Sequence, residues 1–430
     1  MKPGSYVEVK IKNGDVLKGI IMQAKDSKIL SLKLDSGYNV SLDKKNILYV
    51  RELKQKIENK FSQQEEVKFN KNLKTIIILH TGGTVASRVS YKTGAVSPSF
   101  SPNEIINLFP ELKDIANIRS RLIGNMFSED MRFIHYNLIA KEIEKELKSG
   151  VDGIIITHGT DTLAFTSAAL SFALENLNKP VILVGAQRSS DRPSTDAAMN
   201  LICAAQFITR TNFNEVAICI HEKSKDEFCN ILPACKTRKF HSSRRDAFKA
   251  VNSSLIAKVN KEGKLEFLQE YHKKEHKEKL KLKLFNEKLK IGLLKAHPNL
   301  LKEEIRMFSK FNGLIIEGVG LGHLAINKID NHTKENELIY KELKKLSKKI
   351  PVIMSTQCIF GRVNMNVYDT GRRLQEIGIL GNYSDMLPET TFIKLAWLLS
   401  NYKRNQIKDL ISQDFRGEIS KRITYEEEFI

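Results

Sequence analysis

The stretch TIIILHTGGT, residues 75–84, is an uninterrupted apolar run that ends in two glycines flanked by threonines. A second stretch of the same form, GIIITHGTDT, covers residues 153–162, and PVILVGAQ follows at residues 180–187. Short apolar runs that alternate with segments of helical spacing are typical of parallel strands buried on both faces of a sheet. We therefore expect an α/β domain that begins near Thr75.

A second set of apolar runs begins near Lys290 with KIGLLKAH and continues with GLIIEGVG and PVIMSTQ. Between the two sets lies a segment rich in Lys, His and Glu, which we expect to be an exposed linker or helix at residues 271–290. The sequence thus predicts two successive α/β domains with parallel sheets, at residues 75–270 and 291–430.

The first 52 residues alternate apolar and polar positions, as in VEVKIK and LSLKL, with turn residues between the runs. This alternation predicts a small β-barrel domain with one wet face at residues 1–52. The expected strands are Tyr6–Ile11, Val16–Met22, Ile29–Leu34, Tyr38–Leu42 and Ile47–Val50. Residues 53–74 are rich in Lys, Glu, Gln and Asn and are expected to be a linker.

Composition excludes several classes of protein. The chain contains no run of about 18 apolar residues, and its start, MKPGSYVEVK, lacks a secretory core, so we expect a cytoplasmic protein without membrane contact. Its five cysteines form no C-x-x-C pair, so neither a metal site nor a disulfide framework is expected. The formal net charge of +19 is consistent with RNA binding or with a lysine-rich composition, and both interpretations stay open.

Candidate chemistry lies at the two glycine turns, because ligand sites of parallel sheets lie at the carboxyl ends of the strands. There Gly83 and Gly159 have no side chain to obstruct the backbone N–H groups, so each turn can approach a substrate carbonyl closely, beside the hydroxyls of Thr84 and Thr160. Asp161 adds a carboxylate. The plainer alternative is that these side chains cap helices. A threonine nucleophile also needs a base, and spacing alone does not choose one among 69 lysines and arginines.

Five motifs occur in a fixed order between residues 75 and 252: TGGTVASRVSYKTGAVSP, FSEDM, THGTDTLAFTSAAL, VGAQRSSDRPSTDAAMNL and CKTRKFHSSRRDAF. In this order they closely resemble the motifs of the asparaginase-like amidohydrolases. The resemblance implies an amide hydrolase with a threonine nucleophile and a catalytic lysine at Lys239, with Lys236 as the alternative in the same loop. It assigns catalytic roles to Thr84, Thr160, Asp161 and Lys239, and substrate binding to Tyr91, Ser128 and Glu129.

The N-terminal barrel and the later motifs STQCIFGRVNMNVYDTGRRL and DMLPET are similar to one branch of that family, the D subunits of archaeal glutamyl-tRNA(Gln) amidotransferases. This resemblance implies a glutaminase without a cofactor of its own that supplies ammonia to a partner E subunit. The partner would use ATP and Mg and bind most of the Glu-tRNA(Gln). The resemblance also implies a homodimer in which neighbouring subunits help to enclose each site. The alternatives are a free-standing cytoplasmic L-asparaginase and an RNA-binding adaptor.

Other polar residues near the motifs have structural interpretations that we prefer. His158 precedes the Gly-Thr-Asp turn, and we expect a packed imidazole at a strand end rather than a general base. Asp191 and Asp196 are expected to fix a loop or cap the helix that begins near Ala197. For Arg244–Arg245, contact with phosphate, support of the catalytic loop and contact with a partner remain open.

Overall fold

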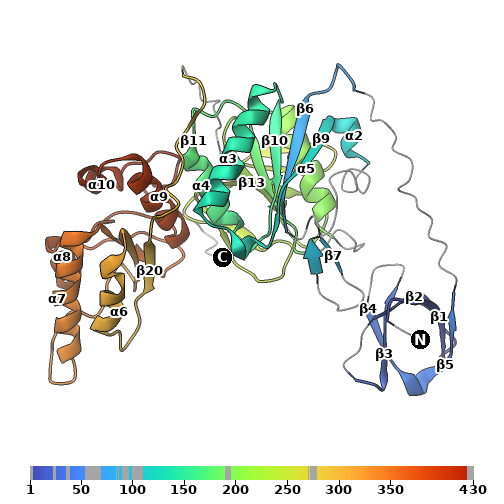
Figure 1. The fold of residues 1–430 in the computed structure, drawn as a ribbon, viewed down its shortest axis with the longest axis horizontal. Coiled ribbons are helices and arrows are strands. Elements are labelled where there is room, and N and C mark those ends of the chain that lie inside the picture. The colour runs from blue at the N-terminus through green and yellow to red at the C-terminus, as the bar shows by residue number, and fades with distance from the viewer. Residues whose placement is uncertain are drawn as a thin grey trace.

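The computed structural model of the chain describes residues 3–22, 26–34, 39–53, 69–83, 85, 87–89, 96–98, 110–188, 195–269, 271 and 278–423. In chain order, Figure 1 shows a small β-sheet, a large α/β body and a smaller α/β body. Across the described ranges, no helix has the length and apolar character needed to cross a membrane.

The N-terminal part is a five-stranded antiparallel sheet of order β4-β3-β2-β1-β5. Its strands are β1 (Tyr6–Ile11), β2 (Val16–Met22), β3 (Ile29–Leu34), β4 (Asn39–Asp43) and β5 (Ile47–Glu52). One face of this sheet buries a small core of Val7, Val9, Ile21 and Leu32. The alternation in the sequence therefore predicted the N-terminal β-strands correctly, and they form an antiparallel sheet in which the first three strands have the expected bounds.

The large body is built on an eight-stranded sheet of order β18-β17-β14-β13-β12-β10-β6-β9. Its strands are β6 (Thr75–Gly82), β9 (Asn117–Met126), β10 (Gly153–Thr157), β12 (Val181–Val184), β13 (Val216–His221), β14 (Cys229–Pro233), β17 (Ala257–Val259) and β18 (Leu265–Phe267). The first five are parallel to one another, as predicted for the apolar runs that form β6, β10 and β12, but β14, β17 and β18 pair antiparallel. The sheet is therefore mixed, because connections as short as residues 222–228 can join only antiparallel neighbours.

Helices cover both faces of this sheet. They are α2 (Leu112–Ile115), α3 (Phe133–Lys148), α4 (Leu163–Ala173) and α5 (Ala197–Arg210). Along β6, Ile77 and Leu79 pack with α3 and α4, whereas Ile76 and Ile78 pack with α2 and α5. All four side chains are almost fully buried, and each such burial contributes about 1.5–3 kcal/mol. Burial on both faces explains why the run has no polar alternation.

Short elements complete the large body and the first sheet. They are the two-stranded pairs β7 (Ser87–Val89) with β8 (Val96–Pro98), β11 (Leu174–Glu175) with β19 (Lys281–Leu282), and β15 (Thr237–Lys239) with β16 (Phe248–Ala250), and the 3-10 helices η1 (Lys44–Asn46) and η3 (Ser128–Asp130).

The smaller body contains a three-stranded parallel sheet of order β20-β21-β22. Its elements are β20 (Ile291–Lys295), α6 (Lys302–Arg306), η4 (Met307–Lys310), β21 (Gly313–Gly318), α7 (Lys334–Lys349), β22 (Val352–Thr356), α8 (Asp369–Glu376), α9 (Pro388–Asn401), η5 (Arg404–Gln406) and α10 (Ile407–Leu410). Helix α9 packs against α4 of the large body, and the rings of Phe172 and Trp397 lie 5.2 Å apart between them. The two α/β bodies therefore share one hydrophobic core.

The segment expected to be an exposed linker is exposed only in part. Residues 272–277 lie outside the described ranges, but Phe285 is 3% exposed and stacks on Phe133 with centroids 5.6 Å apart. The side chain of Asn137 binds both the N–H and the carbonyl of Phe285, each at 2.8 Å. The end of this segment is thus part of the packed interior, because its apolar residues meet α3.

Candidate active site

Two glycine turns meet at the carboxyl edge of the large sheet. Strands β6 and β10 are parallel neighbours that pair His80 with Thr157, so the residues that follow each strand lie side by side. Gly83 has a φ of +76°, and a Cβ atom there would lie 2.4 Å from the backbone nitrogen of Gly159. Glycine is therefore required at position 83 both by conformation and by space. Thr84 and Tyr91 lie outside the described residues.

A third segment reaches the same turn from the end of β9. Ser128, in η3, is 3% exposed, and a Cβ atom on Gly159 would lie 2.8 Å from its Cβ and Oγ atoms. The Thr162 hydroxyl donates to the Ser128 carbonyl at 2.6 Å, and the Thr162 N–H donates to Ser128 Oγ at 3.4 Å. Glu129 follows Ser128 and is exposed. The structure therefore brings Gly83, Gly159 and Ser128 together and leaves the Glu129 carboxylate accessible.

Thr160, Asp161 and Lys239 form a hydrogen-bonded group beside these turns. The Lys239 amine donates to Thr160 Oγ1 at 2.8 Å and to Asp161 Oδ1 at 2.9 Å. Thr160 is 6% exposed, the Lys239 side chain 14% and the Asp161 side chain 67%. An amine this close to a hydroxyl can accept its proton when the amine is uncharged, and a carboxylate can hold the resulting ammonium.

Lys236, the alternative base, points elsewhere. Its side chain is 1% exposed, and its Nζ lies 2.7 Å from Oδ2 of Asp385, which is fully buried. Burial lowers the pKa of Lys236, while the attraction of the Asp385 carboxylate opposes that change. Of the two lysines in this loop, Lys239 is therefore the one that contacts Thr160.

His158 has a packing role in this structure. Its ring is fully buried, Nδ1 donates to the Gly159 carbonyl at 2.7 Å, and Nε2 accepts from the Thr166 hydroxyl at 2.9 Å. Burial lowers the pKa of His158 to about 4, an effect that the bond to Gly159 partly opposes. The imidazole is neutral near pH 7, and both of its nitrogens are occupied, which leaves no free base.

Asp196 fixes the loop that follows β12. Its buried carboxylate accepts the N–H of Gln187 at 3.1 and 2.9 Å and the N–H of Arg188 at 3.0 Å. Burial raises the pKa of Asp196, and these backbone bonds lower it again. Its side chain makes no capping hydrogen bond to α5. Of the two expected roles, Asp196 therefore fixes the loop and does not cap the helix. Asp191 lies outside the described residues.

Asn200 is a site residue that the sequence did not reveal. It is fully buried on α5, and its Nδ2 donates to the Gly185 carbonyl at 2.9 Å, while its Oδ1 accepts from His221 at 2.6 Å. A Cβ atom on Gly185 would lie 2.8 Å from the Thr160 methyl group. Asn200 therefore holds the backbone that packs against Thr160. A lone amide among apolar helix residues, in AAMNLICAA, is the only signal that the sequence offers.

The two arginines of HSSRRDAF are paired within the chain. Arg244 binds both carboxylate oxygens of Asp246, at 2.8 and 2.7 Å. Arg245 donates to Asp226 Oδ1 at 2.7 Å and also to the Ser224 carbonyl. These contacts support the loop-holding interpretation of Arg244–Arg245.

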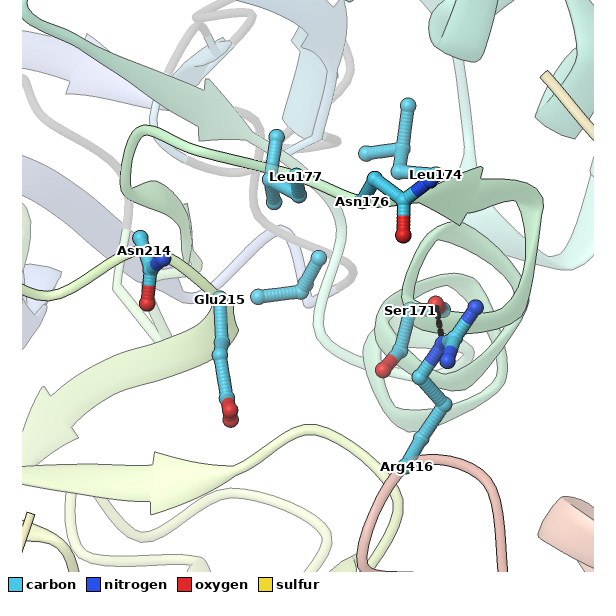
Figure 2. Close-up of a pocket in the computed structure, with 8 residues that line it drawn as sticks. Ser171, Leu174, Asn176, Leu177, Asn214, Glu215 and Arg416 are labelled. Atoms are coloured by element: carbon cyan, nitrogen blue, oxygen red, sulfur yellow. Dashed lines mark hydrogen bonds between the residues drawn. The ribbon is translucent and has the colours of Figure 1, made fainter. Parts of the chain in front are cut away.

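The cavity in Figure 2 lies at the other end of the large sheet. It has a volume of about 40 Å³ and is lined at Val216, where β13 begins, and at Arg416, whose Nε donates to the Ser171 carbonyl at 2.8 Å. Thr160 follows the carboxyl end of β10, so this cavity is separate from the catalytic group. No group of three or more His, Cys, Asp or Glu in the described part of the chain is arranged to hold a metal ion.

Models of known protein families match three successive segments of the chain. The model described as "GatD N-terminal domain" matches residues 1–53. "Asparaginase, N-terminal" matches residues 75–273, and "Glutaminase/Asparaginase C-terminal domain" matches residues 290–411. The proposed catalytic residues all fall within the second of these segments.

Similar proteins fall into two groups. The D subunit of the glutamyl-tRNA(Gln) amidotransferase of Pyrococcus furiosus is 40% identical over 97% of this chain and 94% of its own length, and that of Methanococcus vannielii is 42% identical over 98% and 99%. Among solved structures, the L-asparaginase from Thermococcus kodakarensis has a TM-score of 0.70 at 28% identity, covering 81% of this chain and 100% of that one. L-asparaginase I from Vibrio cholerae has a TM-score of 0.69 at 27% identity, covering 81% and 99%.

Proposed function

Because this chain belongs to the D subunits of glutamyl-tRNA(Gln) amidotransferase within the asparaginase family, we propose that Thr160, Asp161 and Lys239 perform its glutamine hydrolysis. The family, the α/β fold and the glutaminase function were all predicted from the motifs, and the comparisons confirm them. The observation that carries the residue assignment is the Lys239 amine, 2.8 Å from Thr160 Oγ1 and 2.9 Å from Asp161 Oδ1.

The proposed reaction has two steps. A threonine hydroxyl attacks the side-chain amide carbon of glutamine and gives its proton to the uncharged Lys239 amine, and backbone N–H groups of the Gly83 and Gly159 turns stabilise the oxyanion. Ammonia leaves with a proton delivered by the Lys239 amine, and an acyl-threonine remains. Water then releases glutamate and restores the hydroxyl. Either Thr84 or Thr160 is the acylated residue, and Thr160 has the amine within hydrogen-bond distance.

The substrate's amino and carboxylate groups are assigned to the segment after β9. Ser128 lies buried against Gly159, and the exposed carboxylate of Glu129 is available for an ammonium group. Tyr91 completes this proposed binding set. Positioning of the amino-acid end would place the amide carbon at the hydroxyl, which accounts for a large part of the rate enhancement in such sites.

The partner assignments follow from the family rather than from any contact in this chain. We propose that an E subunit uses ATP and Mg to activate glutamate on Glu-tRNA(Gln), binds most of the tRNA and receives the ammonia. We also propose a homodimer of this protein in the cytoplasm and no cofactor in this chain. Free ammonia would be lost to water, so coupling to a synthetase is chemically reasonable.

The test of this function is hydrolysis by the purified full-length chain, alone and with an E subunit, ATP and Glu-tRNA(Gln). We expect glutamine hydrolysis that depends on the partner and the tRNA, with Gln-tRNA(Gln) as product. Fast asparagine hydrolysis by the chain alone, independent of the partner, would instead support the L-asparaginase alternative. Salt-sensitive RNA binding with no hydrolysis under any condition would support an RNA-binding adaptor.

The acylated residue is identified by trapping the intermediate. Rapid acid quench during turnover, followed by peptide mass spectrometry, will place the glutamyl ester on the peptide that contains Thr84 or on the one that contains Thr160. An ester on neither peptide would contradict the threonine mechanism.

A further inference from the structure

The strand that carries Lys239 stands outside the eight-stranded sheet. Within the described residues, β15 pairs only with β16, in a separate two-stranded sheet of three residues each. Two-stranded hairpins are marginally stable on their own. Further contacts must therefore fix the direction in which the Lys239 amine points.

The residue three positions before Lys239 supplies the best-buried of these contacts. Lys236 Nζ lies 2.7 Å from Asp385 Oδ2, and the two side chains are 1% and 0% exposed. The other carboxylate oxygen of Asp385 accepts the N–H of Ser420 at 3.0 Å. This ion pair joins the large body to the C-terminal body directly at the base of the catalytic hairpin.

Neighbouring residues of the hairpin bind the same segment, residues 385–390. The Thr390 hydroxyl donates to the Cys235 carbonyl at 2.8 Å. Arg238 Nε lies 3.4 Å from Glu389 Oε1. The contacts of Lys236 and Arg238 place their side chains against the C-terminal body, whereas the contact of Lys239 places its side chain against Thr160. Within β15, this difference between positions 238 and 239 is the alternation expected of an extended chain.

The catalytic group and the anchor of the lysine strand are each followed by a helix, and these two helices pack together. Helix α4 begins at Leu163, two residues after Asp161, and α9 begins at Pro388, three residues after Asp385. These two helices pack against each other, with Phe172 and Trp397 fully buried between them. This packing therefore fixes the Thr160 hydroxyl and the Asp161 carboxylate relative to Asp385, which anchors the strand that carries Lys239.

We propose that Lys236 and Asp385 are positioning residues, which hold β15 so that the Lys239 amine reaches Thr160 and Asp161. The inference rests on the proposed role of Lys239 in glutamine hydrolysis. Buried ion pairs often add little net stability compared with apolar residues of similar size. We therefore expect the pair to act on the position of the Lys239 amine and not mainly on the stability of the fold.

The experiment compares kinetics of the full-length chain, with its E subunit and Glu-tRNA(Gln), before and after removal of the pair. The variant is Lys236→Met with Asp385→Asn, because it leaves no unpaired buried charge and keeps an oxygen acceptor for Ser420. We expect kcat for glutamine to fall about 100-fold, the effect of misplacing a catalytic group by about 1 Å, with KM little changed. Thermal unfolding confirms that the variant is folded.

A matched control is the pair Lys394 and Glu418. It is also fully buried with an N–O distance of 2.7 Å, and it makes no hydrogen bond or ion pair with residues 236–239. Lys394→Met with Glu418→Gln should keep kcat close to the unmodified value. An equal loss of kcat in both double variants, or no loss in the first, overturns the positioning role.

Lys239→Ala, measured in parallel, separates this inference from the function beneath it. Full activity of Lys239→Ala would remove Lys239 from the reaction and the positioning role with it. An inactive Lys239→Ala beside a fully active Lys236→Met/Asp385→Asn variant would overturn only the positioning role.

Discussion

The amine of Lys239 lies 2.8 Å from the hydroxyl oxygen of Thr160, although 79 positions separate the two residues in the chain. Thr160 follows a strand of the large sheet, and Lys239 lies on a small hairpin outside it. The contact therefore depends on how separate elements of the fold pack against one another.

Removal of any one of the side chains of Thr160, Asp161 and Lys239 should strongly reduce ammonia release without unfolding the protein. For Lys239→Ala we expect a decrease in kcat of about 10²–10⁴-fold, which is the usual contribution of a positioned acid or base. Thr160→Ala and Asp161→Ala should behave in the same way, whereas Thr160→Ser keeps the hydroxyl and should retain activity. A coupled ammonia assay and circular dichroism provide the measurements, and full activity of a variant excludes that residue from the mechanism.

Gly83→Ala should disrupt the meeting of the two turns. The added methyl carbon would lie 2.4 Å from the nitrogen of Gly159, at a φ of +76°. We expect a loss of about 1–3 kcal/mol in unfolding free energy together with loss of glutaminase activity. Gly150→Ala is the control, because φ there is +88° but no atom lies within 4 Å of the added carbon. Denaturant unfolding should show a smaller loss for Gly150→Ala, and its activity should persist.

Glu129→Gln should weaken glutamine binding and leave the chemical step nearly intact. A charge-assisted hydrogen bond contributes about 1.5–3 kcal/mol, so KM should rise by about 10- to 150-fold. Asp130→Asn changes the neighbouring carboxylate of the same 3-10 helix and should leave KM unchanged. Equal KM values for the two variants would argue against the binding role of Glu129.

Stability should fall as the pH drops from 7 to 5, because two buried histidines resist protonation. Burial lowers the pKa of both His80 and His158 to about 4. The unfolded chain binds these protons near pH 6.5 and the folded chain does not, so acid favours unfolding. Each histidine should cost about 2 kcal/mol over this interval. Urea unfolding at several pH values measures the slope, and His158→Asn should reduce it. An unchanged slope in that variant would contradict the assignment.

The sequence predicted those parts of the molecule that depend on local patterns. Apolar runs without polar alternation predicted the buried strands β6 and β10. The glycines that follow these runs predicted the two tight turns, at Gly83 and Gly159. The antiparallel strands β14, β17 and β18 were missed because they are only three to five residues long, and β17 and β18 each carry a charged residue between two apolar ones.

The choice between Lys236 and Lys239 lay beyond local pattern. Both lysines belong to one basic loop, and only their contacts with Asp385 and Thr160 distinguish them. These contacts depend on packing between segments far apart in sequence. Family resemblance pointed to Lys239, and the contact with Thr160 now supports that assignment. Asn200 was missed for the same reason, because its partners Gly185 and His221 lie on other strands or loops.

The separation of 149 positions between Lys236 and Asp385 also sets the order in which the site is assembled during synthesis. A ribosome that adds about 5–20 residues per second needs roughly 7–30 s to cover this interval. A nascent chain that ends before Asp385 contains every proposed catalytic side chain but lacks the anchor of the lysine hairpin. If the pair positions Lys239 as proposed, the nascent enzyme would therefore reach its full glutaminase activity only after Asp385 has been synthesised.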